Sequence, residues 1–249
     1  MQVLFLHNNF PAQFGQLSQA LIKEGVDVWY GTQRKNSSLQ GLKVFNYEPH
    51  REPATQTHPY AGNFEKAVLT GQAVARSALA HKKNGLAPDL VVAHSGWGPG
   101  LFAKDTWPDA KYIGYFEWYY RPDSPDVLHL NDQNRELDEQ LRSRSRNAAI
   151  LMDLANCDAG LCPTEFQADQ FPECFRSKLH VLHDGVDTQT YQRNPEVKPP
   201  IEGVSFYGRR TIHHLCCSGD GALSRLPGIY EVAGNHSKSQ AECSRDYCW

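Results

Sequence analysis

Short apolar runs alternate along the chain with longer stretches in which apolar residues recur at helical spacing. The run at 3–6 comes first, and Phe14, Leu17 and Leu21 then repeat at the three-to-four-residue spacing of one helix face. By the same criteria the sequence predicts further strands at 26–30, 42–47, 88–94, 111–116, 159–162 and 179–183, and helices at 64–83 and 133–156. Strands that are apolar throughout and alternate with helices are typical of a parallel sheet covered on both faces. We therefore expect an α/β fold with a doubly wound, Rossmann-like parallel sheet.

Polar residues that directly follow the predicted strands are the first candidates for a functional site. In open parallel sheets, ligands bind at the carboxyl ends of the strands, where the connecting loops begin. In this sequence those positions hold Asn8, Asn9, His94, Glu117, Thr164 and Asp184.

The loop from Asn8 to Gly15 opens the first predicted helix. Free backbone N–H groups at a helix start could bind a phosphate. The loop lacks the G-x-G-x-x-G spacing of dinucleotide-binding proteins, which argues against nicotinamide or flavin binding. An ordinary strand-to-helix connection, capped by the Asn side chains, explains the same residues equally well.

His94 and Glu117 are the candidates for catalysis. His94 lies between a buried strand and the glycine-rich loop 95–100, where an imidazole could exchange a proton or hydrogen-bond a sugar hydroxyl. Glu117 lies within an aromatic run, 116–120, and aromatic faces beside a carboxylate suit sugar recognition. Each feature also has a plainer explanation, a structural histidine in the first case and simple packing in the second.

Composition narrows the function classes. The 249 residues carry a formal net charge of -3, which gives no reason to expect binding to nucleic acid or anionic lipid. The first residues form only a short apolar run without a basic segment, so neither a signal peptide nor a transmembrane segment is predicted. Three cysteines lie in residues 1–210 and four in 211–249, so we expect a cytoplasmic body and a tail of different composition. The His and Cys residues of the tail lack zinc-site spacing, and no metal or other cofactor is expected.

Three segments together resemble one family. Residues 7–15 (HNNFPAQFG), 115–121 (YFEWYYR) and 163–172 (PTEFQADQFP) followed by 183–187 (HDGVD) are similar to the N-terminal domain of family 4 glycosyltransferases, over roughly residues 1–209. The resemblance implies the GT-B architecture, in which two Rossmann-like domains face a cleft. It also implies a nucleotide-sugar donor held mainly by the C-terminal domain, a glycan or lipid-linked acceptor, and transfer that retains anomeric configuration without a metal.

Site residues of the family carry over position by position. The positions near the donor diphosphate are Asn9, Gly15 and Arg209. The catalytic positions are His94 and Glu117, and many relatives have a histidine in place of Glu117. The acceptor side of the cleft is assigned Asn8, Trp97, Tyr119, Thr164 and Asp184. A lipid-linked acceptor would bring a cytoplasmic enzyme of this kind into peripheral contact with the membrane.

The resemblance divides the chain into three parts. We expect residues 1–195 to form the acceptor-side domain, 196–209 a linker and the start of the donor domain, and 210–249 a disordered, non-homologous tail. The donor lysine and paired glutamates of the family have no counterparts in that tail. Read one base later, residues 218–233 permit a translation that resembles the missing donor-domain start, so we hypothesise a frameshift; a native divergent tail is the alternative.

The function that the resemblance implies is therefore glycosyl transfer, with very weak or no activity in this truncated chain. The face that should pack on a donor domain would favour association with other proteins. A non-catalytic glycan- or partner-binding domain is the main alternative and predicts saturable glycan binding without donor hydrolysis. An unrelated Rossmann-type enzyme is a third, against which the missing glycine fingerprint weighs.

Overall fold

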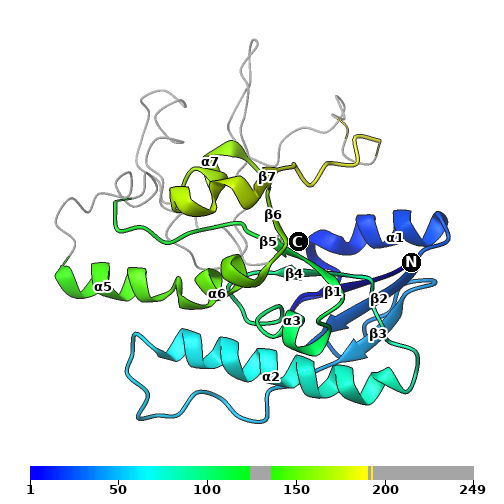
Figure 1. The fold of residues 1–249 in the computed structure, drawn as a ribbon, viewed down its shortest axis with the longest axis horizontal. Helices are drawn as coiled ribbons and strands as arrows, with labels where there is room; N and C mark the ends of the chain where they lie inside the picture. The colour runs from blue at the N-terminus through cyan, green and yellow to red at the C-terminus, as the bar shows by residue number, and fades with distance from the viewer. Residues whose placement is uncertain (124–135, 190–191, 193–249) are drawn as a thin grey trace, which may run out of the picture. The chain divides into compact units, whose positions relative to one another are not determined.

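The computed structural model describes residues 1–123, 136–189 and Gln192. Its strands form one sheet in the order β3-β2-β1-β4-β5-β6-β7, and every neighbouring pair is parallel (Figure 1). The strands are β1 (Gln2–Leu6), β2 (Asp27–Thr32), β3 (Lys43–Asn46), β4 (Leu90–His94), β5 (Lys111–Tyr115), β6 (Ala159–Cys162) and β7 (Leu179–Val181). The strand order reverses between β1 and β4, which confirms the predicted doubly wound sheet.

The two faces of the sheet are packed by alternate residues of each strand. In β1, Leu4 and Leu6 belong to a core cluster that also contains side chains of α2 (Gly62–Lys82), α3 (Ala103–Thr106) and α6 (Ala148–Asn156). Val3 and Phe5 point to the other face and pack with Phe14, which leads into α1 (Gly15–Lys23). Figure 1 shows α2 and α3 on one side of the sheet and α1 on the other. Successive strand residues face opposite ways, so continuously apolar strands require this double cover.

The predicted helix at 133–156 is wrong as a single element. Its described part is two helices, α5 (Leu137–Ser145) and α6, which separate at Arg146 and Asn147. The N–H groups of these two residues bond back only three positions, a pattern that closes a helix. The side chain of Asn147 bonds the backbone of Tyr120 instead, accepting from its N–H at 2.8 Å and donating to its C=O at 2.7 Å. Residues 133–135 lie outside the described part.

The remaining predicted helices and strands agree with the structure to within two residues at each end. Thr164 caps the short helix α7 (Glu165–Ala168), and its hydroxyl accepts from the N–H of Gln167 at 3.2 Å. Two 3₁₀ segments, η1 (Ala12–Phe14) and η2 (Glu173–Lys178), complete the elements. No helix within the described ranges is both long and apolar enough to cross a bilayer.

Close packing fixes the glycine-rich loop that follows β4. Gly98 has a φ of +94°, and a Cβ built there would lie 2.1 Å from the carbonyl oxygen of Ala67 in α2. At Gly100 a Cβ would lie 2.1 Å from the Tyr112 hydroxyl. Neither position has room for a side chain, so the loop that carries Trp97 lies directly against α2 and β5.

The chain divides into two compact units. The first consists of Met1–Ser124 and Arg135–Gly185, and holds every strand and helix named above. The second consists of Pro125–Asn134 and Val186–Trp249, of which only residues 186–189 and Gln192 are described. The predicted domain boundary at 195, the linker at 196–209, Arg209 and the tail at 210–249 therefore lie outside the described residues and stay predictions.

Candidate functional site

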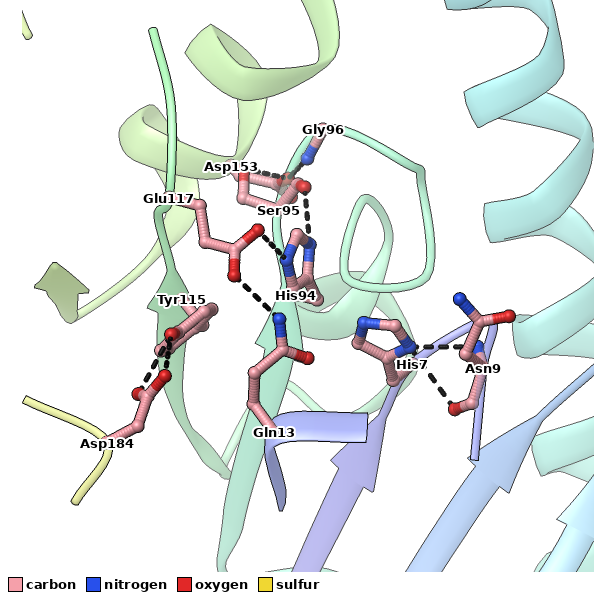
Figure 2. A network of polar contacts seen from close by, with 10 residues as sticks. All are labelled: His7, Asn9, Gln13, His94, Ser95, Gly96, Tyr115, Glu117, Asp153 and Asp184. Atoms are coloured by element: carbon pink, nitrogen blue, oxygen red, sulfur yellow. Dashed lines mark hydrogen bonds and ion pairs between the residues drawn. The ribbon is translucent and has the colours of Figure 1, made fainter. Parts of the chain in front are cut away.

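The structure brings His94 and Glu117 together. His94 ends β4 and pairs in register with Tyr115 of the neighbouring strand. Glu117, two residues after Tyr115, therefore lies at the same end of the strands as His94. His94 Nε2 lies 3.1 Å from Glu117 Oε2, and Nδ1 lies 2.9 Å from the carbonyl oxygen of Ser95 (Figure 2). The imidazole is only 5% exposed. Both ring nitrogens face oxygen acceptors, so a ring nitrogen that carries a proton can donate a hydrogen bond.

Glu117 is held from a second direction by a residue that the sequence reading missed. Gln13, in η1, donates from Nε2 to Glu117 Oε1 at 2.6 Å. The hydrogen bond from His94 lowers the pKa of Glu117, against the opposing effect of burial. Glu117 is therefore an ionised carboxylate at neutral pH, with both oxygens oriented.

A second histidine lies against the first. The His7 ring meets the His94 ring edge to face at 4.8 Å between centroids. The backbone N–H of Asn9 donates to His7 Nδ1 at 2.8 Å, which requires an unprotonated nitrogen there. Burial, followed by the charge of His94, lowers the pKa of His7 to about 4. The His7 ring is therefore neutral at neutral pH.

Asp153, from α6, anchors the loop after β4 from behind. One carboxylate oxygen accepts from Ser95 Oγ at 2.8 Å and from the N–H of Gly96 at 3.3 Å (Figure 2). The other accepts from the Tyr112 hydroxyl at 3.0 Å. The side chain is buried, and this burial raises the pKa of Asp153 to about 6 despite the three donors. A buried carboxylate with three partners fixes the backbone next to His94.

His94 and Glu117 border a pocket of about 370 Å³ at the carboxyl ends of β4 and β5. Its lining combines aromatic faces with amides and charged groups, a mixture that is typical of small-molecule sites. The described lining residues are Asn8, Asn63, Lys66, Ala67, His94, Ser95, Gly96, Trp97, Phe116, Glu117, Trp118, Tyr120, Arg146 and Ile150.

Four residues selected from the sequence meet in this pocket: Asn8, His94, Trp97 and Glu117. Asn8 is oriented by Tyr47, whose hydroxyl donates to its Oδ1 at 2.9 Å. Trp97 is 58% exposed, which leaves its ring free to contact a ligand.

Two residues assigned to the donor diphosphate lie in the β1–α1 connection, outside the described pocket lining. The N–H of Asn9 is taken by His7, and its side-chain oxygen accepts from Arg34 Nε at 3.2 Å. Gly15 begins α1 and packs tightly, since a Cβ there would lie 2.9 Å from Pro11. Their predicted contact with a diphosphate stays a prediction.

The other three acceptor-side candidates also lie outside the described lining of the pocket. Tyr119 packs against Phe171, with 5.4 Å between ring centroids. Thr164 caps α7, and Asp184 accepts hydrogen bonds from the Tyr115 hydroxyl at 2.8 and 2.7 Å (Figure 2). The structure gives each of these side chains a local structural partner, and their role toward an acceptor stays a prediction.

Metal ligands do not cluster in residues 1–123 or 136–189, where no group of three or more His, Cys, Asp or Glu side chains could hold an ion. The His and Cys residues of the tail lie outside the described residues, and the expectation of metal-independent chemistry stays a prediction.

Comparison with known families supplies the identity of the fold. The model of the glycosyl transferase family 4 group matches residues 24–191. The chain belongs to this family. No curated protein sequence matches the chain significantly.

Solved structures similar to this glycosyltransferase family 4 protein include two synthases and one protein in complex with UDP. A sucrose-phosphate synthase chain from Thermosynechococcus elongatus is 14% identical, with a TM-score of 0.47 over 76% of this chain and 92% of that one. The catalytic domain of starch synthase IV from Arabidopsis thaliana, bound to ADP and acarbose, is 13% identical with a TM-score of 0.47, over 80% and 54% of the two chains. HepE of Anabaena in complex with UDP is 13% identical with a TM-score of 0.44, over 78% and 47%. The family 4 chain thus spans about half the length of the latter two.

Proposed function

We propose that the unit described here is the acceptor-binding half of a nucleotide-sugar glycosyltransferase, and that the pocket at β4 and β5 receives the acceptor sugar. The observation that supports this most strongly is the ion pair of His94 and Glu117 in a pocket lined by two tryptophans. Membership of glycosyl transferase family 4 gives the reaction class.

The geometry suggests a role for each group. In glycosyl transfer the acceptor oxygen forms a bond to the anomeric carbon, the bond from that carbon to the diphosphate breaks, and the proton of the acceptor hydroxyl leaves with the diphosphate. The carboxylate of Glu117 can accept a hydrogen bond from that hydroxyl, and its contacts with His94 and Gln13 hold it in position. The rings of Trp97 and Trp118 offer apolar faces for the C–H groups of a pyranose.

Donor chemistry depends on other residues. The departing diphosphate needs positive charge or helix N-termini, which the family resemblance assigns to the donor half. Residues 210–249 hold no counterparts of the donor lysine and glutamates of the family. We therefore propose that the 249-residue chain binds an acceptor but turns over nucleotide sugars very weakly or not at all.

Sugar binding by the 249-residue protein tests this function. Tryptophan fluorescence titrations with mono- and disaccharides should saturate, since two tryptophans line the pocket. E117Q keeps the size of the side chain but removes its charge, and we expect it to weaken binding about tenfold. E24Q, an exposed carboxylate at the end of α1, is the matched control and should bind like the unaltered protein.

Two results would contradict the proposal: no saturable binding of any sugar, or binding that E117Q leaves unchanged. Release of a nucleotide diphosphate from common donors, assayed in parallel, separates the alternatives. Turnover at ordinary enzymatic rates would refute the predicted inactivity, whereas glycan binding without turnover is also what a non-catalytic binding domain predicts.

A further inference from the structure

Two basic side chains line the pocket from opposite elements, and the proposed reaction does not use either. Lys66 projects from α2, and Arg146 lies at the junction of α5 and α6. Glu117 is the one acidic residue in the described lining, against the two cations Lys66 and Arg146. The described pocket therefore carries an excess of positive charge that a neutral sugar would not require.

Arg146 is held in place by the surrounding fold. Its guanidinium lies 5.2 Å from the centre of the Tyr120 ring, within the range of a cation–π contact. The backbone of Tyr120 is in turn fixed by both hydrogen bonds to the buried amide of Asn147. None of the ion pairs formed among residues 1–123 and 136–189 involves Arg146. Its guanidinium N–H groups thus remain able to bind an anion at the pocket.

Lys66 has a partner that a ligand can replace. Its ammonium lies 3.5 Å from a carboxylate oxygen of Glu52, and the two side chains are 59% and 79% exposed. Exposed pairs of this kind contribute at most about 1 kcal/mol to stability. An anion bound in the pocket can therefore replace Glu52 as the partner of Lys66 at little cost.

We propose that the acceptor is an anionic sugar, carrying a phosphate ester or a carboxylate that Lys66 and Arg146 bind. The sugar ring lies against the tryptophans, with its reacting hydroxyl toward Glu117 and its anionic group toward the two cations. This inference rests on the proposed function and specifies its substrate class. A guanidinium and an ammonium are the usual partners of phosphate and carboxylate oxygens.

The test compares four probes on the 249-residue protein by tryptophan fluorescence and calorimetry: glucose, glucose 6-phosphate, glucuronic acid and inorganic phosphate. At low ionic strength we expect glucose 6-phosphate or glucuronic acid to bind at least tenfold more tightly than glucose, and added salt to reduce the difference. The better of the two identifies the anion as a phosphate ester or a carboxylate. Inorganic phosphate should bind at least tenfold more weakly than the charged sugar.

Variants assign the effect to the two side chains. K66Q and R146Q should each weaken binding of the charged sugar about tenfold and leave glucose binding unchanged. R146K keeps the charge and should retain part of the affinity, which separates loss of charge from loss of fold. K23Q, an exposed lysine at the end of α1, is the matched control and should have no effect.

Three results would overturn the proposal: equal affinity for charged and neutral sugars, a preference for the charged sugar that survives in the K66Q/R146Q double variant, or inorganic phosphate binding as tightly as the charged sugar. If glucose binds, depends on Glu117 and is not improved by a charged group, the acceptor-binding function stands and the anionic acceptor does not. If no probe binds, both proposals fail.

Discussion

Polar residues follow two pairs of strands at the carboxyl ends of this sheet, and their side chains have different roles in the two pairs. After β4 and β5, His94 contacts the carbonyl oxygen of Ser95 and Glu117 accepts a hydrogen bond from Gln13. Both His94 and Glu117 line an open pocket. After β6 and β7, Thr164 and Asp184 are occupied by a helix cap and by a tyrosine hydroxyl.

The comparison shows that a position after a parallel strand is not sufficient to make a site. A site also requires a hollow, and polar atoms whose orientation is fixed by groups outside that hollow. The β4–β5 pair meets both conditions. Asp153, outside the described pocket lining, fixes the loop after β4 through Ser95, and Asn8 and Trp97 line the pocket. The four predictions below test this difference.

Removal of the carboxylate behind the β4 loop should have the largest effect on stability. D153A leaves Ser95 Oγ, the Gly96 N–H and the Tyr112 hydroxyl without their partner, and we expect it to lower the free energy of unfolding by about 3 to 4 kcal/mol. D184N, at the exposed β7 end, should cost less than about 1 kcal/mol. Urea denaturation measures both variants, and equal losses would remove the distinction between the two pairs of strands.

The free energy of unfolding should depend on pH in opposite ways in variants of two buried residues, His7 and Asp153. The pKa of His7 falls from 6.5 to about 4 on folding, so the unfolded state binds more protons and acidification through this window costs about 3 kcal/mol. The pKa of Asp153 rises from 3.8 to about 6, so the folded state binds more protons and acidification from about 6 to 4 recovers about 3 kcal/mol.

These two contributions oppose each other in the unaltered protein. D153N should therefore lose stability more steeply than the unaltered protein between pH 6.5 and 4, and H7N should lose less or gain. Urea denaturation at a series of pH values gives the slopes, and groups common to all three proteins cancel in the comparison. Parallel curves for the three proteins would show that these two residues do not titrate as described.

Loss of the cap after β6 should affect stability alone. T164A removes the hydroxyl that accepts from Gln167 N–H and should lower the free energy of unfolding by about 1 kcal/mol, the usual value of an N-cap. T164S keeps the hydroxyl and is the control. Sugar affinity should not change in either variant. A tenfold loss of affinity in T164A would indicate that Thr164 belongs to the acceptor site.

The smallest effect is expected at the residue that orients Glu117. Q13A removes the 2.6 Å hydrogen bond to Oε1 while His94 still holds the other oxygen, so sugar affinity should fall only about threefold, or about 0.7 kcal/mol. Unfolding should be almost unchanged. A loss as large as that of E117Q would mean that Gln13 itself contacts the ligand.

The fold and half of the site follow from sequence patterns for local reasons. Apolar runs and helical spacing depend on neighbours within a few residues, and the rule for carboxyl ends selected His94 and Glu117 without knowledge of their distance. Asp153 was missed, although an acidic residue within the apolar helix 148–155 is a signal that could have found it.

Other features depend on contacts that no local pattern records. The break between α5 and α6 arises because Asn147 bonds the backbone of Tyr120, a contact across 27 residues. Gln13 reaches Glu117 across 104 residues. In the sequence, Lys66 and Arg146 fall within two separate predicted helices and nothing links them. Only the packing of α2 beside α6 brings them to one pocket.

We propose that the acceptor binds at the carboxyl ends of β4 and β5. Nuclear magnetic resonance titration of the ¹⁵N-labelled 249-residue protein with a saturating sugar tests it most directly. We predict that chemical-shift changes concentrate at the indole N–H groups of Trp97 and Trp118 and at the backbone N–H groups of 94–98 and 117–120. Changes centred on Thr164 and Asp184, with the β4–β5 residues unmoved, would contradict the account.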